Sequence, residues 1–347
     1  MTFYAAPDYY TDMKKRSVLR NVALLGLSVA VALFVTESAL RITGRKPLVV
    51  NPEQTLFWHY HPELGWAHEP GVEGVFEKPQ FRTLVRINQK GLRDRDHTYE
   101  RKDETKRILV LGDSFAWGFG VEQTERFSEH LEEFMEVEVI NAGVSGYSTD
   151  QELLWYRSEG IQYRPDLVIL VMSGNDAGDN HKLRNYMIYG KPRFILEGED
   201  LKLTGVPVSG VSAQYKVVYY LAQRSALLNA VLAARRQMRA RLHSADDTAT
   251  PYELTRALLR EIENVASGNG ARFMIVTTRV FWSRADKYAD FVDILRADGF
   301  SVLDSEAQFD HDTMIIPGDG HWNPAGHEFV ARKIEEYIRA DTLLGAR

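Results

Sequence analysis

The stretch RILVLGDSFAWGFG, residues 107–120, determines how the rest of the chain is interpreted. Its first part, residues 108–111, is a short apolar run typical of a strand buried on both faces of a parallel sheet. Gly112 ends the strand, and Asp113 and Ser114 follow on the turn. Open α/β folds bind ligands where parallel strands end, so the Ser114 hydroxyl is a candidate nucleophile. The alternative is that these two polar residues only shape the turn.

The composition limits the kinds of site that the chain can build. Its 347 residues are enough for one large α/β domain with additions. Lys and Arg number 42 against 48 Asp and Glu, a formal net charge of -6, so no basic excess indicates a nucleic-acid partner. There is no cysteine, which excludes disulfides, thiolate metal sites and a cysteine nucleophile. No cofactor is expected.

Residues 18–36 are almost wholly apolar, interrupted only by Arg20, Asn21 and Ser28. A helix of roughly 20 such residues crosses a bilayer. The basic residues at 14–16 precede the run, and an excess of Lys and Arg marks the cytoplasmic side. We therefore expect a cytoplasmic tail, a transmembrane anchor and an exported remainder.

Two alternatives to an uncleaved anchor exist. A cleaved signal peptide would use the Ala-Val-Ala sequence at 30–32, which falls inside the apolar run and leaves a short apolar segment at 22–29. A buried helix of a soluble protein is the other alternative, but the basic flank argues against it. The anchor is the interpretation we favour.

We expect the chain to divide into an anchor at 1–45, a β-rich lead-in at 46–105 and an α/β domain at 106–347. The lead-in contains HPELGWAHEPG at 61–71, rich in Pro, Gly and aromatic residues, and then an alternating strand-like pattern. Residues 93–105 are interpreted as a charged linker.

From residue 107 onward, strand and helix signals alternate. Strands are predicted at 108–111, 137–140, 166–172, 273–277 and 300–303. Helices are predicted at 126–135, 149–158, 250–266, 285–296 and 323–339, two of them opened by the capping boxes Thr149-x-x-Glu152 and Thr250-Pro251-x-Glu253. This alternation predicts right-handed crossovers and a parallel sheet of five strands.

Residues 180–247 interrupt the alternation as an insertion, which we expect to shape substrate access. A hairpin is predicted around 197–200. Residues 215–242 are predicted to form one helix with an apolar component and a basic end. We expect this helix to pack in the ordinary way with a solvated basic end, and a membrane-facing helix is the alternative.

Four polar loops end strands or lead into helices on what should be one rim of the sheet. They are Gly-Asp-Ser at 112–114, Asn-Ala-Gly at 141–143, Gly-Asn-Asp at 174–176 and Asp-Gly-His at 319–321. Together they supply a hydroxyl, a glycine backbone, an amide, a carboxylate and an imidazole. Acyl transfer through a serine needs this set of groups.

These motifs, in this order, resemble those of the SGNH (GDSL-like) hydrolase superfamily, with Ser114 in GDSF, Gly143 in NAG, Asn175 in GND and His321 in DGHWNPAGH. The resemblance implies a three-layer, flavodoxin-like α/β/α fold. It also implies that His321 activates Ser114, and that the Ser114 and Gly143 N–H groups and the Asn175 amide stabilise the oxyanion. The anchor and the lead-in look like those of membrane-tethered bacterial members.

The chain departs from the family pattern at two positions. Ser173 occupies the first glycine of the usual Gly-x-Asn-Asp block. The acid that commonly stands three residues before the histidine is replaced by Gly318, and Asp319 stands two before His321. Side chains two apart in an extended segment point to the same side, so Asp319 is the expected triad acid, with Asp312 in reserve.

Two other interpretations concern the same region. The side chains of a metal cluster would be His311, Asp312, Asp319 and His321, but their spacing matches no specific metal pattern, so no metal is expected. Trp282 and Trp322 either line the site, where they would stack on a sugar, or belong to the hydrophobic core.

The favoured function is a membrane-anchored, extracytoplasmic serine esterase that removes small acyl groups, such as acetyl, from an ester or an acylated glycan. An O-acyltransferase that passes the acyl group to a polysaccharide with the same triad is one alternative. A non-catalytic glycan-binding or scaffold protein is another. The intact Ser114, Asn175 and His321 argue against this last one, because a binding module does not need them.

Overall fold

The computed structural model describes residues 9–47, 56–101, 104–184, 189–243, 252–282 and 285–345. The chain forms two compact units, one of Met1–Val50 with Ser212–Asp246 and one of Asn51–Val211 with Asp247–Arg347. The predicted tail up to residue 8 lies outside the described residues, as do Thr250 and Pro251 of the second predicted capping box.

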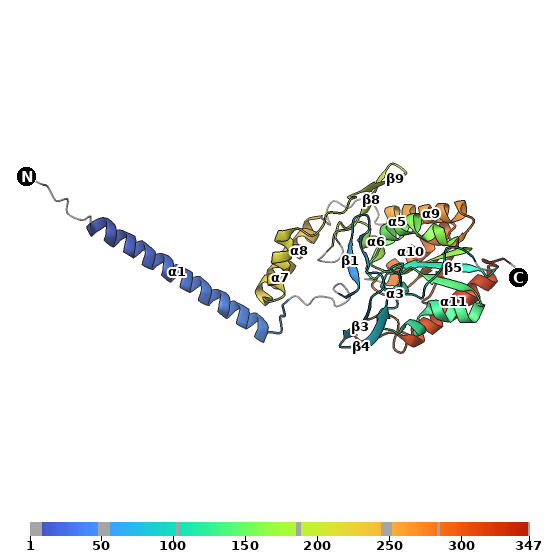
Figure 1. The fold of residues 1–347 in the computed structure, drawn as a ribbon, viewed down its shortest axis with the longest axis horizontal. Coiled ribbons are helices and arrows are strands. Elements are labelled where there is room, and N and C mark those ends of the chain that lie inside the picture. Colours follow the sequence, from blue (N-terminus) through green and yellow to red (C-terminus); the bar gives the residue numbers. More distant parts are fainter. Residues whose placement is uncertain are drawn as a thin grey trace, which may run out of the picture. The chain divides into compact units, whose positions relative to one another are not determined.

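The larger unit is built on a parallel sheet of five strands (Figure 1), in the order β11-β10-β7-β5-β6. The strands are β5 (Arg107–Gly112), β6 (Glu138–Asn141), β7 (Leu167–Met172), β10 (Arg272–Thr277) and β11 (Val302–Asp304). β5 lies inside the sheet, with Leu109 paired to Ile140 on one side and to Val168 on the other. The predicted strands and their parallel arrangement are confirmed.

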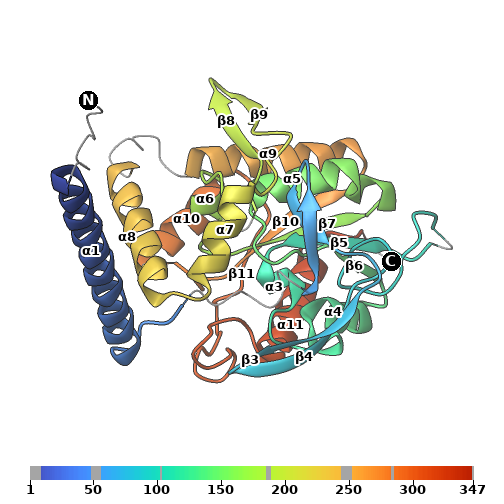
Figure 2. The same cartoon turned by 60° about the vertical axis from the view of Figure 1, so that its left-hand side comes forward.

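Helices cover both faces of the sheet (Figure 2). One face carries α5 (Thr149–Ser158), α9 (Tyr252–Gly268) and α10 (Ala285–Ala297), and the other carries α4 (Phe127–Met135) and α11 (Pro324–Ala340). Alternate side chains of β5 serve the two cores: Leu109 and Leu111 pack in the first, and Ile108 and Val110 in the second. The predicted three-layer α/β/α fold is confirmed.

The starts of α11 and α5 are capped in different ways. Asn323 caps α11 by accepting a hydrogen bond from the N–H of Gly326. The capping box at α5 is wrong, because Ser148 is the N-cap, and the Thr149 hydroxyl and the Glu152 carboxylate have no hydrogen-bond partner among the described residues. Glu152 is instead buried within the protein.

The lead-in forms two antiparallel hairpins, β1 (Trp58–His61) with β2 (Gly65–His68) and β3 (Glu73–Lys78) with β4 (Phe81–Arg86). Three of its aromatic side chains, Phe57, Trp66 and Phe76, are fully buried in the same core as the sheet. The β-rich character is as predicted, but the segment packs into the catalytic unit.

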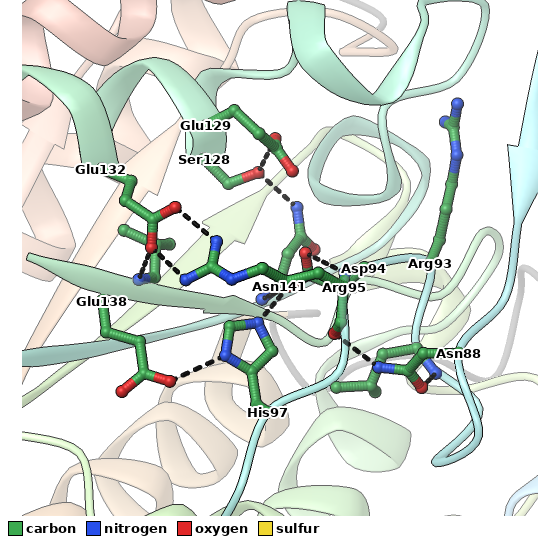
Figure 3. A network of polar contacts seen from close by, with 12 residues as sticks. Asn88, Arg93, Asp94, Arg95, His97, Ser128, Glu129, Glu132, Glu138 and Asn141 are labelled. Atoms are coloured by element: carbon green, nitrogen blue, oxygen red, sulfur yellow. Dashed lines mark hydrogen bonds and ion pairs between the residues drawn. The ribbon is translucent and has the colours of Figure 1, made fainter. Parts of the chain in front are cut away.

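Three residues of the predicted charged linker, Arg93, Asp94 and His97, are buried. Asp94 accepts hydrogen bonds from the backbone N–H of Asn141 and from His97, and His97 also contacts Glu138 (Figure 3). Burial disfavours protonated His97, but the bond and charge of Asp94, and then those of Glu138, outweigh it and raise the pKa of His97. Buried charges are tolerated when paired, and a count of charges in the sequence does not show the pairing.

The predicted insertion is divided between the two units. Residues 189–211 belong to the larger one and form the predicted hairpin, β8 (Arg193–Glu197) with β9 (Asp200–Thr204). Lys191, Phe194 and Val208 of this part are buried. Two short 3₁₀ turns, η1 (Gln123–Glu125) and η2 (Gly160–Tyr163), complete the larger unit outside its active site.

The smaller unit is helical, with α1 (Tyr9–Ile42), α7 (Ala213–Ala222) and α8 (Ala226–His243). Within α1, Lys15–Ile42 is long and apolar enough to cross a membrane, and its most apolar window has no buried residue. The single helix predicted at 215–242 is wrong. The chain breaks between α7 and α8, where the Ser225 hydroxyl accepts a hydrogen bond from the N–H of Leu228 and so starts a new helix.

Candidate active site

The nucleophile candidate stands at the carboxyl end of the central strand β5. Gly112 has φ +151°, and a Cβ there would lie 2.8 Å from the Cβ of Ala116, so only glycine allows this sharp turn. Asp113 then caps the short helix α3 (Ser114–Trp117) by accepting the N–H of Phe115 at 2.9 Å. Ser114 is the first residue of that helix, where the N–H has no intrahelical acceptor.

Ser114, His321 and Asp319 form a continuous hydrogen-bonded chain. His321 Nε2 lies 2.8 Å from Ser114 Oγ, and His321 Nδ1 lies 2.5 Å from Asp319 Oδ1. An ionised carboxylate only accepts, so Nδ1 carries the proton and Nε2 accepts from the serine hydroxyl. The arrangement is that of a Ser-His-Asp triad.

The reserve acid and the metal alternative are not assembled in the structure. Asp312 is exposed on a turn, and His311 contacts Glu306. Among the described residues, no three His, Asp or Glu side chains are placed to hold a metal ion.

Aromatic rings surround the imidazole. The Phe119 ring stacks on His321 with 4.3 Å between centroids, and Phe115 and Phe281 lie at 4.9 and 5.3 Å. Phe281 is 48 % exposed and has φ +67°, an unusual conformation for a residue that is not glycine. Trp322 is fully buried against Phe115, so it is a core residue.

Trp282 packs with Tyr252, Tyr288 and Phe291 in the aromatic cluster beside α10. Phe281, and not Trp282, is therefore the exposed aromatic residue that contacts the imidazole. Phe281 was not predicted as a site residue, because nothing in the sequence marks its backbone conformation.

A lysine of the lead-in approaches the triad acid. The ammonium of Lys78, at the end of β3, lies 3.9 Å from Asp319 Oδ2 and 4.1 Å from the centre of the Phe119 ring. Burial favours the neutral form of Asp319, but the hydrogen bond and charge of His321, and then the charge of Lys78, outweigh it and lower the pKa of Asp319. Lys78 was not among the candidate residues of the sequence analysis.

The amide of Asn175 is held at both ends. Its Oδ1 is 2.7 Å from Ser173 Oγ, and its Nδ2 donates to Asp179 Oδ2 at 3.2 Å, within the short helix α6 (Asp176–Asp179) and its cap. Ser173 Oγ is also 2.8 Å from Asp113 Oδ2. The serine that replaces the family's glycine therefore links the Asp113 carboxyl to the amide.

The single proton of the Ser173 hydroxyl cannot serve both acceptors. Asn175 Oδ1 carries no proton, so both contacts are favourable when Asp113 is protonated and donates to Ser173, which donates to Asn175. Burial raises the pKa of Asp113, although the hydrogen bond from the N–H of Phe115 opposes the shift. A raised pKa favours the protonated form of Asp113 that this arrangement needs.

Gly143 lies directly against the nucleophile helix. A Cβ at this position would be 2.5 Å from the backbone nitrogen of Trp117, so only glycine fits. The N–H of Gly143 donates to Asn141 Oδ1 at 2.9 Å, and Asn141 Nδ2 donates to the carbonyl of Ala116. Gly143 N–H as an oxyanion donor stays a prediction.

Four buried carboxyl groups lie near one another beside the nucleophile turn; they are Asp113, Asp150, Glu152 and Asp176. Lys191 donates to Asp150 at 2.5 Å, and both side chains are 0 % exposed. Burial and the neighbouring carboxylates raise the pKa of Glu152 well above its usual value. Lys191 lies in the predicted insertion, and its contact with Asp150 was not predicted.

A family comparison agrees with this geometry. Residues 110–329, more than half of the chain, match the model of the GDSL-like lipase/acylhydrolase family. The chain belongs to this family. The protein is thus a serine hydrolase that acts on ester bonds, and the resemblance noted from the four motifs is confirmed.

Solved structures of GDSL-type hydrolases and esterases are similar to this chain. They include a lipase/acylhydrolase from Enterococcus faecalis (12% identity, 68% of this chain and 97% of that chain, TM-score 0.39), the psychrotrophic esterase EstA from Pseudoalteromonas sp. (13%, 68% and 98%, 0.39) and a family 3 carbohydrate esterase from Clostridium thermocellum (15%, 69% and 98%, 0.39). No curated protein matches the chain.

Proposed function

We propose that this GDSL-like hydrolase is a membrane-anchored esterase that removes small acyl groups, such as acetyl, from a glycan outside the cytoplasm. The observation that carries the proposal is the hydrogen-bonded chain from Ser114 through His321 to Asp319. Phe281 offers an exposed aromatic face beside the imidazole, which suits a sugar ring.

The proposed reaction passes through an acyl-enzyme. Ser114 Oγ attacks the ester carbonyl carbon while its proton moves to His321 Nε2. The bond to the alcohol oxygen then breaks, and His321 returns the proton to the departing alcohol. Water, deprotonated by His321, attacks the acyl carbon, releases the carboxylic acid and restores the Ser114 hydroxyl. Asp319 orients the imidazole and stabilises its protonated form.

The oxyanion of each tetrahedral intermediate needs hydrogen-bond donors. We assign this role to the N–H of Ser114 and to the Asn175 amide, whose orientation is supported by Ser173. The N–H of Gly143 is the third predicted donor, and it must leave Asn141 Oδ1 to act.

The location follows from the first helix. The apolar run at 18–36 has the length of a membrane span, and the basic residues at 14–16 favour a cytoplasmic amino terminus. The catalytic unit, which follows the span, would then lie outside the cytoplasm.

A charged, membrane-impermeant fluorophosphonate tests the nucleophile and the location together. In intact cells we expect the probe to label the full-length wild type at Ser114, and not the Ser114→Ala variant. Labelling of the wild type only after lysis contradicts the location but not the esterase. No labelling in either preparation contradicts the nucleophile.

The same preparation separates hydrolysis from acyl transfer. Purified protein in detergent is given an aryl acetate with and without a polysaccharide acceptor. Release of free acetate at the same rate in both cases supports the esterase, and acetylated polysaccharide in place of free acetate identifies an O-acyltransferase.

Asn175→Ala is expected to lower kcat on an aryl acetate by about 100- to 1000-fold, the usual loss for one oxyanion donor. KM should change far less, because the amide acts mainly in the transition state. The control is Asn264→Ala, on the exposed surface of α9, which should keep wild-type kinetics. An unchanged kcat in Asn175→Ala removes the amide from the proposed oxyanion site.

Lys78→Met is expected to move the acidic limb of the pH profile of kcat/KM to higher pH. The lysine cation favours ionised Asp319, so its loss raises the pKa of that carboxyl, and Asp319 stops supporting the imidazole at a higher pH. A partly exposed pair of this kind gives a shift of about 0.2 to 0.7 pH units. Arg82→Met, on the exposed side of the same hairpin, is the control and should leave the profile unchanged.

A further inference from the structure

The unit formed by α1, α7 and α8 carries an apolar surface that the esterase chemistry does not use. We propose that the α7–α8 hairpin lies in the headgroup region of the bilayer that α1 crosses, and so makes a second contact with anionic lipid. This inference rests on the membrane span of the proposed function and is independent of the acyl chemistry.

The start of α8 is held at the end of the apolar run of α1. The apolar run of α1 ends at residue 36, and Glu37 follows it. The Glu37 carboxylate accepts hydrogen bonds from the backbone N–H groups of Ala226 and Leu227, at 2.8 and 2.9 Å, and from the Ser225 hydroxyl at 2.9 Å. The start of α8 is therefore fixed to the first residue beyond the apolar run.

Two further contacts join the same ends. Arg41 donates to the carbonyl of Arg224 at 2.7 Å, and Asn229 donates to the carbonyl of Lys46 at 3.1 Å. Every one of these contacts involves a residue of the first segment after position 36. If the apolar run spans the hydrocarbon core, the corner between α7 and α8 is at the level of the headgroups.

These contacts also explain a carboxylate at the end of a membrane helix. An ionised side chain at this depth is expensive unless it is paired. Glu37 is paired with the N-terminus of α8, where the free N–H groups and the positive end of the helix dipole favour an anion. Arg41, one turn further along α1, supplies the opposite charge.

The hairpin also has an exposed apolar face. Val217, Tyr220 and Leu221 follow one another on one side of α7, and Val231 and Met238 are two turns apart on α8. Their side chains are between 46% and 61% exposed, although all five are large and apolar or aromatic. Amphipathic helices with such a stripe bind in the plane of a membrane surface.

The segment that forms the hairpin is also strongly basic. Residues 212–243 contain no Asp or Glu, and their six basic residues are Lys216, Arg224, Arg235, Arg236, Arg239 and Arg241. The guanidinium carbon of Arg224 lies 3.6 Å from the centre of the Tyr220 ring. A cationic surface that carries aromatic and aliphatic side chains matches the anionic headgroups and the outer acyl carbons of a bilayer.

Because the chain has no cysteine, single cysteines can report the depth of chosen positions. Full-length Val217→Cys and Val231→Cys probe the proposed lipid face, Leu27→Cys is the reference in the span, and Lys202→Cys on the β8–β9 hairpin is the reference in water. Each is labelled with an environment-sensitive fluorophore and reconstituted in phosphatidylcholine vesicles, with or without phosphatidylglycerol. Quenching by nitroxides attached to the headgroup or deep in the acyl chain is then measured.

We expect the labels at 217 and 231 to lose more fluorescence to the headgroup nitroxide than to the deep one. Their loss should also rise with phosphatidylglycerol, while Leu27→Cys is quenched by the deep nitroxide and Lys202→Cys by neither. Hairpin labels that behave like Lys202→Cys, or that emit as buried without being quenched, overturn the proposal while the span stands. A Leu27→Cys label that no lipid quenches contradicts the span itself.

Discussion

Ser114→Ala is expected to lower kcat on an aryl acetate by roughly 10⁴- to 10⁶-fold, because the covalent route is lost with the nucleophile. The hydroxyl is 2.8 Å from His321 Nε2, so no adjustment is needed before the proton moves. Substrate binding does not depend on this hydroxyl, and KM should change little. The measurement is steady-state kinetics on the purified full-length protein, with the melting temperature as the check of folding.

Two companion variants sharpen this experiment. His321→Ala should cost about as much as Ser114→Ala, and the double variant should be no slower than either, since members of a triad act as a unit. Ser158→Ala, an exposed serine at the end of α5, is the control and should keep wild-type kcat. A folded Ser114→Ala protein with wild-type turnover contradicts the proposed mechanism, as does a double variant whose losses multiply.

Much of this site was predictable from the sequence because its groups stand where strands end. The apolar runs at 108–111 and 166–172 locate buried parallel strands, and the polar residues that follow them meet at one edge of the sheet. Asp319 was expected as the acid because side chains two apart in an extended segment face the same side. Asp319 does contact His321, but from a turn in which Gly320 has φ +100°, and not from an extended segment.

What the sequence did not reveal depends on contacts between distant segments. Lys78 reaches the triad acid from a hairpin more than two hundred positions earlier, and nothing in its local sequence differs from an exposed lysine. Arg93 and Asp94 appeared to be linker residues, but they are buried against Gly118 and Asn141. A charged side chain is expected to be exposed only when the fold gives it no ion-pair or hydrogen-bond partner. Such partners come from distant segments, so the local sequence does not show them.

The capping box at Thr149 failed for a related reason. Its spacing matches the motif, but the Glu152 side chain is buried beside other carboxyl groups and does not return to the helix start. Lys191 was not predicted as a structural residue either, because it lies in a segment that interrupts the strand alternation. Its buried pairing with Asp150 depends on the fold. Lys191 gives the largest stability effect that we expect.

Lys191→Met is expected to destabilise the folded protein by about 3–5 kcal/mol near neutral pH, because it leaves Asp150 buried without its cation. Burial already raises the pKa of Asp150 against the opposing charge of Lys191, and losing the lysine raises it further. An acid whose pKa is raised on folding binds its proton more tightly in the folded state. The destabilisation should therefore be larger at pH 7 than at pH 5, because protonation of Asp150 at lower pH favours the folded state.

The matched control is Lys202→Met, in the same segment of the chain. Lys202 pairs with Glu197 on the surface, where both side chains are more than half exposed, so its loss should cost less than about 1 kcal/mol at either pH. Denaturant unfolding of each full-length variant in detergent, followed by tryptophan fluorescence, gives its loss of unfolding free energy relative to the wild type. Two variants at two pH values give four losses to compare. Equal losses of unfolding free energy in the two variants would contradict the role of Lys191 as the buried cation that pairs with Asp150. A loss in Lys191→Met that does not shrink at the lower pH would show that the unpaired group is not a carboxylate.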